Sequence, residues 1–355
     1  MTEKTLVMAV CGDINIQGRE HPAKAFRLVE DRLAVADVRL ANLEMCLSGA
    51  DDALDVKRPV TDRPPWMQSD PSMVEALTSV DLSAVTTANN VTSGETTIRS
   101  SLRVLDDHGI LHTGSGANRA DAHLPAVLQA DDGTRIGLLG YTCPTYPKGH
   151  VANETDAGVA AVRCLTAYQP NHRVLEMPGV SPVVRTWPEP EDLAVMEAEV
   201  RALRDEVDVL VVYFHMGVSL REDLAEYQTI VARAAVHAGA DAVFGASAHV
   251  PQAIEVYQGV PIFYGMGNFA FDWWFMEAHR TGLFVECDIR GGRIQDARVF
   301  PVTRTLNEEN LVQILSADDA SGGRQIIDRV IDLSQPFGTT FEHAGDYIRL
   351  NGLGA

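Results

Sequence analysis

The sequence predicts an α/β protein whose sheets contain both parallel and antiparallel strands. Apolar, β-rich runs recur along the chain, and helical patterns lie between several of them, as expected for sheets that are covered by helices. The strand-like runs are residues 6–11, 38–43, 82–87, 135–141, 207–215, 242–245, 262–264 and 282–289. The helical patterns are residues 23–34, 71–78, 95–108, 190–204 and 222–238. The turn at Gly291-Gly292 after the last run predicts a hairpin, so at least one pair of strands is antiparallel.

Composition and charge place the chain among soluble globular proteins. It has 355 residues, of which 46% are hydrophobic and 22% are charged, and its formal net charge is −20. This charge repels nucleic acid and anionic membranes, so we expect neither as a partner. No run reaches the roughly 18 apolar residues of a membrane span, and the N-terminus lacks a signal-peptide pattern, so we expect a cytoplasmic protein. The five cysteines form no CxxC pair, which argues against a disulfide framework.

We expect one large domain over residues 1–300 and a C-terminal extension, residues 301–355, that packs on the same domain. Residues 144–190 interrupt the α/β pattern with seven prolines. A long irregular segment inside a compact domain is often a lid or a substrate loop, and the alternative is a disordered surface insertion. The sequence does not decide between the two. It also leaves open whether the chain forms a homo-oligomer.

Polar residues follow six of the apolar runs, at the strand ends where α/β proteins bind ligands. They are Gly12-Asp13, Asn42-Leu43-Glu44, Asn89-Asn90, His215, His249 and Asn268. Each is a weak signal alone, because Gly-Asp and paired Asn often form turns and a lone histidine is more often a core residue. Together they supply carboxylate, amide and imidazole groups, which suit a divalent cation such as Mn, Mg, Fe or Zn. We therefore expect a site for one or two metal ions and a small-molecule or oligomeric substrate.

The order of these segments resembles the CapA family of poly-γ-glutamate capsule synthesis (PGA_cap), in the calcineurin-like metallophosphoesterase superfamily. The resemblance covers roughly residues 5–300 and is most specific over residues 215–272, where the spacing agrees as well as the residues. It implies a four-layer αββα sandwich of two mixed sheets. The metal ligands that it implies are Asp13, Glu44, Asn89, His215 and His249. Of these, it implies catalytic roles for Asp13, Glu44, His215 and His249, with Asn90 and Asn268 as substrate contacts.

Three departures from the family pattern bear on activity. Val91 stands where the family has a histidine that helps to protonate the leaving group or to stabilise charge, and valine can do neither. Ala246 and Ser247 stand where further histidines are usual, so the second metal position loses imidazole. Met216 replaces a tryptophan, which changes packing more than chemistry.

We expect a soluble metal-dependent hydrolase, or an enzyme derived from one, that acts on a phosphate ester or on an amide such as a glutamyl-type bond in a biosynthetic pathway. The alternative is a non-catalytic protein that binds a poly-acid or a partner through a degenerated metal site. The retained carboxylates of Asp13 and Glu44 favour the enzyme. Trp273 and Trp274 come directly after Phe271-Asp272 in the sequence. They are predicted to line a substrate pocket, or else to belong to a core cluster or a subunit contact.

Overall fold

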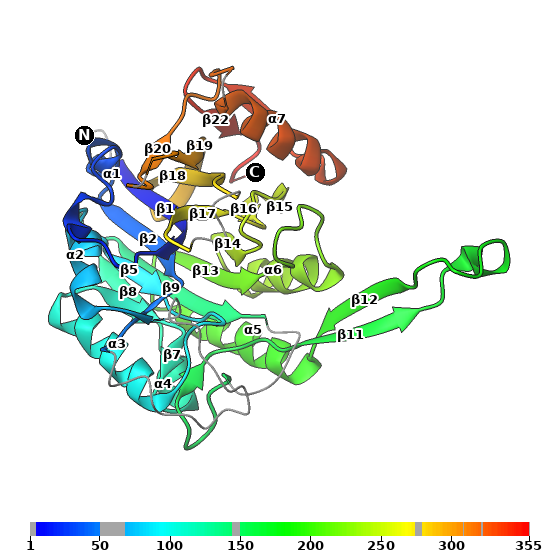
Figure 1. The fold of residues 1–355 in the computed structure, drawn as a ribbon, viewed down its shortest axis with the longest axis horizontal. Coiled ribbons are helices and arrows are strands. Elements are labelled where there is room, and N and C mark those ends of the chain that lie inside the picture. The colour runs from blue at the N-terminus through cyan, green and yellow to red at the C-terminus, as the bar shows by residue number, and fades with distance from the viewer. Residues whose placement is uncertain are drawn as a thin grey trace.

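Two large mixed sheets form the centre of the computed structural model, which describes residues 5–49, 68–143, 150–273, 279–307, 309–320 and 322–354 (Figure 1). The larger sheet has ten strands in the order β21-β22-β19-β18-β1-β2-β5-β6, with β17 beside β1 and β20 beside β19. Their bounds are Leu6–Asn15 (β1), Val38–Leu43 (β2), Ala84–Thr86 (β5), Leu111–Thr113 (β6), Asn268–Phe271 (β17), Gly282–Arg290 (β18), Arg293–Arg304 (β19), Val312–Ile314 (β20), Phe341–His343 (β21) and Ile348–Leu350 (β22). β1 pairs in parallel with β2 and β17 and antiparallel with β18, so the sheet is mixed.

The smaller sheet has six strands in the order β15-β16-β14-β13-β9-β8. Their bounds are Ala126–Gln129 (β8), Arg135–Thr142 (β9), Val209–Met216 (β13), Ala242–Ser247 (β14), Ile254–Tyr257 (β15) and Val260–Phe263 (β16). The four inner strands are parallel and the two outer ones are antiparallel. Shorter strands form three separate pairs: Cys46–Leu47 (β3) with Gln68–Ser69 (β4), Ser115–Gly116 (β7) with Gly158–Val159 (β10), and Cys164–Gln169 (β11) with Val183–Pro188 (β12).

Helices cover the outer face of each sheet. The α-helices are Glu30–Leu33 (α1), Val74–Thr78 (α2), Glu95–Asp107 (α3), Arg119–Ala122 (α4), Pro190–Arg204 (α5), Glu226–Ala238 (α6) and Gly323–Ser334 (α7), and the short 3-10 turns are Pro22–Lys24, Pro71–Met73, His172–Leu175 and Gln335–Phe337. Apolar side chains of α1, α2 and α3 pack with outward-facing residues of β1 and β2. Those of α5 and α6 pack in the same way on β9, β13 and β14. The predicted four-layer αββα arrangement is confirmed.

The main apolar core lies between the two sheets. Because side chains alternate along a strand, Met8 and Val10 of β1 face Val211 and Tyr213 of β13 across this core. The Tyr213 hydroxyl donates a hydrogen bond to the Cys11 backbone oxygen at 2.8 Å and so joins the sheets directly. At one end of this core the carboxyl ends of β1, β2, β13 and β14 come together.

Most of the predicted strands are confirmed, but the helix predicted over residues 23–34 is wrong. The chain there forms only the 3-10 turn at Pro22–Lys24 and the four-residue α1. Neither segment has a side-chain hydrogen bond at its N-cap. Between them Phe26 is held by tertiary packing, since its ring stacks on Phe269 of β17 with 5.9 Å between centroids.

The structure also describes most of the two segments that the sequence set apart, residues 144–190 and residues 301–355. The boundary expected after residue 300 falls inside β19, and the residues beyond it include α7, β21 and β22, the last of which pairs with β19. Much of the segment predicted to be irregular, residues 144–190, forms the antiparallel hairpin β11–β12, which projects from the body (Figure 1). Residues 144–149 lie outside the described residues. Across the described ranges, no helix combines the length and apolar character needed to cross a bilayer.

The backbone of Gly267 approaches Gly12 so closely that position 12 requires a glycine. A Cβ added at Gly12 would lie 2.1 Å from the Gly267 carbonyl oxygen, which also accepts a hydrogen bond from the Asp13 backbone N–H at 3.0 Å. Gly12→Ala should therefore push β17 away from β1 and lower the free energy of unfolding by about 1–3 kcal/mol. Chemical denaturation measures this, with Gly179→Ala as the control because no atom lies within 4 Å of its added Cβ. Equal stability of the two variants would contradict the expectation.

Candidate metal centre

Three parallel strands of the larger sheet place polar residues in one row. In the register of the sheet, Asp13 of β1 lies beside Asn42 of β2 on one side and Asn268 of β17 on the other. Glu44 follows β2 directly and shares the face of Asn42, because side chains two residues apart point the same way along an extended chain. The end of β1 carries an irregularity in its register on both sides of Asp13, which turns this residue into the space between the sheets.

The smaller sheet supplies two histidines to the same space. His215 is the seventh residue of the eight-residue strand β13 and lies beside Ala246 of β14. His249 follows β14 in a turn in which Ser247 and His249 both have positive φ, at 84° and 57°. Such left-handed conformations are costly for residues with a side chain and are often retained at functional sites. The turn places the His249 imidazole beside the carboxylates of the other sheet.

The four ionisable groups lie within a few ångströms of one another. Glu44 Oε1 is 4.0 Å from His215 Nε2 and 3.8 Å from His249 Nε2. Asp13 Oδ2 is 3.7 Å from His249 Nδ1. Ligand atoms of Asp13, Glu44 and His215 all fall within 4.8 Å of each other. The structure therefore brings together four of the five residues that were predicted as metal ligands, and all four are buried.

Amide side chains and one backbone N–H orient two of the four groups, Asp13 and His215. Asn42 Nδ2 donates to Asp13 Oδ1 at 2.6 Å and lies 3.2 Å from His215 Nδ1. Asn90 Oδ1 lies 2.7 Å from His215 Nε2. The Ser247 backbone N–H donates to Asp13 Oδ2 at 3.1 Å. These contacts place the proton of a neutral His215 on Nε2, so a cation bound at that nitrogen would require the other tautomer, with the proton on Nδ1.

The second imidazole is held in a single tautomer. His249 Nδ1 lies 2.9 Å from Asn268 Oδ1, which can only accept, so the proton resides on Nδ1 and Nε2 keeps its lone pair. That lone pair faces Glu44 Oε1, which is another acceptor. Two acceptors that face each other in a buried site repel unless a proton or a cation lies between them.

Several buried oxygen atoms of the cluster have no hydrogen-bond donor. Both carboxylate oxygens of Glu44, the amide oxygen of Asn42 and the amide oxygen of Asn15 are without a partner among the described residues. Buried acceptors are normally satisfied, so such a group of unsatisfied oxygens calls for an explanation. Carboxylate, amide and imidazole donors around one point fit a hard or borderline divalent cation.

Burial favours the neutral form of all four groups, because it raises the pKa of the two carboxyl groups and lowers the pKa of the two imidazoles. Burial raises the pKa of Asp13 to about 7, against the opposing effect of its hydrogen bonds from Asn42 and Ser247. Burial, reinforced by repulsion from Asp13, raises the pKa of Glu44 well above its ordinary value. Burial lowers the pKa of His249 to about 4, and burial together with the neighbouring His249 holds the pKa of His215 well below its ordinary value. A bound cation would reverse this preference for the carboxylates and needs the neutral imidazoles.

One residue of the predicted ligand set does not reach the cluster in the expected way. The Asn89 amide oxygen accepts hydrogen bonds from the Val91 and Thr92 backbone N–H groups and from the Thr92 hydroxyl, at 3.0–3.2 Å. Its amide nitrogen donates to the Leu43 backbone oxygen at 2.8 Å. Asn89 therefore shapes the turn, and the neighbouring Asn90 presents its oxygen to His215. We replace Asn89 by Asn90 in the candidate ligand set.

Two further residues of the cluster were not predicted as ligands. Asn15 lies two residues after Asp13 and donates from Nδ2 to the Glu44 backbone oxygen at 2.6 Å. Asn42 lies two residues before Glu44 and bridges the two sheets. The signal that could have found both is the two-residue period of an extended chain, which gives each asparagine the same face as the neighbouring carboxylate.

Two of the positions at which the family has a histidine, 91 and 246, hold buried apolar residues in this chain. Val91 is buried in a small apolar group with Phe271 and Trp273, and the Phe271 ring lies edge-on to His249 with 5.2 Å between centroids. Ala246 is buried in the core between the sheets. No proton donor therefore occupies position 91. Trp274, the second predicted pocket residue, lies outside the described residues.

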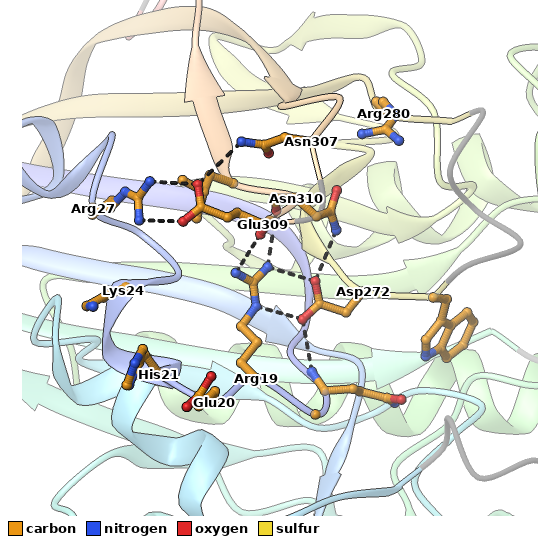
Figure 2. Close-up of a pocket in the computed structure, with 14 residues that line it drawn as sticks. Arg19, Glu20, His21, Lys24, Arg27, Asp272, Arg280, Asn307, Glu309 and Asn310 are labelled. Carbon is orange, nitrogen blue, oxygen red and sulfur yellow. Dashed lines mark hydrogen bonds and ion pairs between the residues drawn. The ribbon is translucent and has the colours of Figure 1, made fainter.

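A pocket of about 540 Å³ adjoins this apolar group, and Trp273 forms part of its wall (Figure 2). The Trp273 ring is 6.2 Å from that of His249 between centroids. Arg19 and Asp272 form a two-point ion pair in the pocket at 2.8 and 2.7 Å. The Asp272 backbone N–H donates to the Asn15 backbone oxygen at 2.9 Å, so the pocket and the cluster share the end of β1. Trp273 is thus both a pocket wall and part of a buried aromatic group.

Two curated relatives of the chain are named for the synthesis of a polymer. It is 28% identical over 208 residues to the PGA biosynthesis protein CapA of Bacillus subtilis, an alignment that covers 58% of this chain and 47% of that protein. It is 28% identical over 249 residues to a probable polyglutamine synthesis accessory protein of Mycobacterium tuberculosis, covering 69% and 58% of the two. The chain thus spans about half the length of the curated relatives it matches.

A solved structure also aligns with the chain. It is a novel phosphatase from Mycoplasma pneumoniae, with a TM-score of 0.47, 12% identity and coverage of 85% of this chain and 95% of that one. The profile described as bacterial capsule synthesis protein PGA_cap matches residues 7–273, a span that holds all the residues of the buried cluster. The chain therefore belongs to the PGA_cap family.

Proposed function

We propose that the chain is a metal-dependent hydrolase that acts on a phosphate ester or on an amide such as a glutamyl-type bond. The observation that carries this proposal is the Glu44 carboxylate, which is fully buried between two imidazoles and a second carboxylate. Neither of its oxygens has a hydrogen-bond donor among the described residues. A protein that used these groups only for stability would give such a carboxylate a partner.

The residues that would hold one or two ions are Asp13, Glu44, Asn90, His215 and His249. When bound, a divalent cation such as Mn, Mg, Fe or Zn polarises a phosphoryl or carbonyl oxygen and lowers the pKa of a water molecule. The chain's own contribution is orientation. Asn268 and Asn42 fix the two imidazoles and one carboxylate, as outer hydrogen-bond partners do in metal sites.

The pocket beside Trp273 is the place that we propose for the substrate. Its rim carries Lys24 and His21, whose side chains make no hydrogen bond or ion pair with the described residues, and it opens next to the apolar group that covers His249 (Figure 2). The lining carries the cationic side chains of Arg19, Lys24, Arg27 and Arg280 against the carboxylates of Glu20, Asp272 and Glu309. This small excess of positive charge favours a substrate with an anionic group, which both a phosphate ester and a glutamyl chain possess. The names of the two relatives support the glutamyl alternative.

A second candidate function is binding without turnover. It is favoured by the position of Val91, which packs on Phe271 and Trp273 and leaves that side of the cluster without a proton donor. In this case the cluster would hold an ion and an acidic polymer or partner, and no bond would be cleaved.

Metal loading followed by substrate assays separates the two functions. The protein is stripped with a chelator, reloaded with each ion in turn, and assayed with phosphomonoesters, phosphodiesters and γ-glutamyl amides. We expect turnover with at least one ion, its loss in His249→Ala, and a fall in kcat/KM of about 10–100-fold in Asn268→Ala, because that residue orients His249. A loaded protein without turnover on any substrate would favour binding, and failure of every ion to bind would contradict both.

Replacing Glu44 should have opposite effects with and without metal. In metal-free protein at pH 8, Glu44→Gln removes the cost of burying an unpaired carboxyl group, whose pKa burial holds well above its ordinary value, and should raise the free energy of unfolding by about 1–3 kcal/mol. In excess Mn²⁺ the same change should lower stability relative to wild type, because a ligand is lost. Chemical denaturation with chelator and with Mn²⁺ measures both effects.

The matched control for this experiment is Glu255→Gln. Glu255 is also buried, but its oxygens are bonded to Arg233 at 2.7 Å and to the Tyr264 hydroxyl at 2.6 Å. It should lose stability to the same extent in both conditions. A Glu44 variant that behaved like the control would mean that this carboxylate is not a metal ligand.

Metal affinity should depend on pH through the carboxylates. Because Asp13 has a pKa raised to about 7 and must ionise to bind a cation, protons compete with the metal below that pH. We expect Mn²⁺ affinity to fall at least tenfold per pH unit between pH 7 and pH 5. The imidazole of His249 does not compete in this window, since its pKa is lowered to about 4. Titration calorimetry in buffers of different ionisation enthalpy measures the affinity and the released protons, and a flat profile would refute the assignment.

A further inference from the structure

The hairpin β11–β12 forms an arm, residues 164–188, that extends away from the body (Figure 1). Its two strands pair antiparallel over their whole length, from Cys164 beside Pro188 to Gln169 beside Val183, and a 3-10 turn lies at the tip. The two strands form a sheet of their own. An isolated two-stranded hairpin is marginally stable in water, so the extended arm needs a further contact to be held.

The arm exposes an unusual amount of apolar surface. Seven of the fifteen large apolar side chains that are exposed among the described residues belong to it. They are Leu165, Tyr168, Val174, Leu175, Met177, Val184 and Trp187. Leu175 is 93% exposed and Tyr168 is 72% exposed. Concentrated apolar exposure of this kind marks an interaction surface rather than ordinary surface scatter.

One edge of the arm is open. β12 is covered near its base by α6, where Glu226 accepts a hydrogen bond from the Thr186 backbone N–H at 3.1 Å and pairs with Arg185. The opposite strand, β11, pairs with β12 and with no other strand in the described part of the chain. An open strand edge is a template for another strand.

Charge and size point to a second copy of the chain as the occupant. Arg173 and Arg185 against Glu176 give the arm a net charge of +1. Because the net charge of the whole chain is −20, the remaining residues carry a net charge of −21. Two bodies of this charge repel strongly at short range, whereas a net charge of +1 on each arm opposes the pairing of two arms only weakly. The arm has 25 residues, and a stable interface uses about 20–30 residues on each side.

We propose that two copies of the chain dimerise through their arms, with β11 of one copy pairing antiparallel with β11 of the other about a two-fold axis. The result is a four-stranded sheet, β12-β11-β11-β12. This pairing closes the open edge on both copies at once and brings the exposed side chains of the two arms together. A two-fold axis suits the pairing because one strand edge serves as both partners.

Sedimentation velocity of the full chain tests the dimer. We expect a dimer at micromolar concentration and an increase of at least 100-fold in its dissociation constant in the double variant Leu165→Asp, Tyr168→Asp. Val35→Asp and Leu124→Asp are the matched controls, because both side chains are more than half exposed, at 56% and 59%, and lie outside the arm. They should leave the dimer unchanged. Circular dichroism and the melting temperature establish that each variant is folded.

Cross-linking tests the strand pairing itself. The five native cysteines are buried, so a cysteine placed at the middle of β11 by Thr166→Cys or Ala167→Cys is the accessible thiol. Mild oxidation should convert at least one of these variants into a covalent dimer, since paired strands bring Cα atoms within disulfide reach. A monomer at all concentrations, a dimer that survives the double aspartate change, or no cross-link at either position would overturn the proposal.

Discussion

The buried carboxylate of Glu44 is the constraint on which the arrangement of the site depends. It lies at the end of β2, between imidazoles from the other sheet, and no donor from the described part of the chain reaches either of its oxygens. Placing a charge in such surroundings is costly unless an opposite charge accompanies it. The same cost of burying a charge raises the pKa of Glu44 and Asp13 and lowers the pKa of the two histidines. The divalent cation proposed above would satisfy all four groups at once.

The sheets are built so that these groups can meet. The parallel strands β1, β2, β13 and β14 all end at the same end of the inter-sheet core. The side-chain period of two points His215 into this core, and the register irregularity on both sides of Asp13 turns that carboxylate into it as well. Gly12 lets Gly267 approach so closely that β17 joins β1 beside Asp13. Asn268 then reaches His249 from that added strand. The geometry of the candidate metal centre is thus a consequence of strand order and of one glycine.

The sequence alone identified the ionisable groups that follow apolar runs, and it was less able to identify the asparagines that contact them. Asp13, Glu44, His215 and His249 follow apolar runs, and the parity of a strand is visible in the sequence. The choice between Asn89 and Asn90 depends on a turn in which Asn89 bonds to Val91 and Thr92, and such local hydrogen bonding has no periodic signal. The arm was expected to be irregular because its prolines obscured the two short strands.

The apolar group beside His249 shows how the site can be electrostatically strong and still lack one chemical function. Val91, Phe271 and Trp273 exclude water from one side of the cluster, and low polarity there strengthens every interaction with a charge. The same packing leaves no proton donor at position 91. A leaving group that departs as a stable anion needs no such donor, whereas an amine leaving group must be protonated. For an amide substrate the proton must therefore come from water or from the substrate itself, and a phosphate ester with a weakly basic leaving group places the smaller demand on the residues that this chain retains.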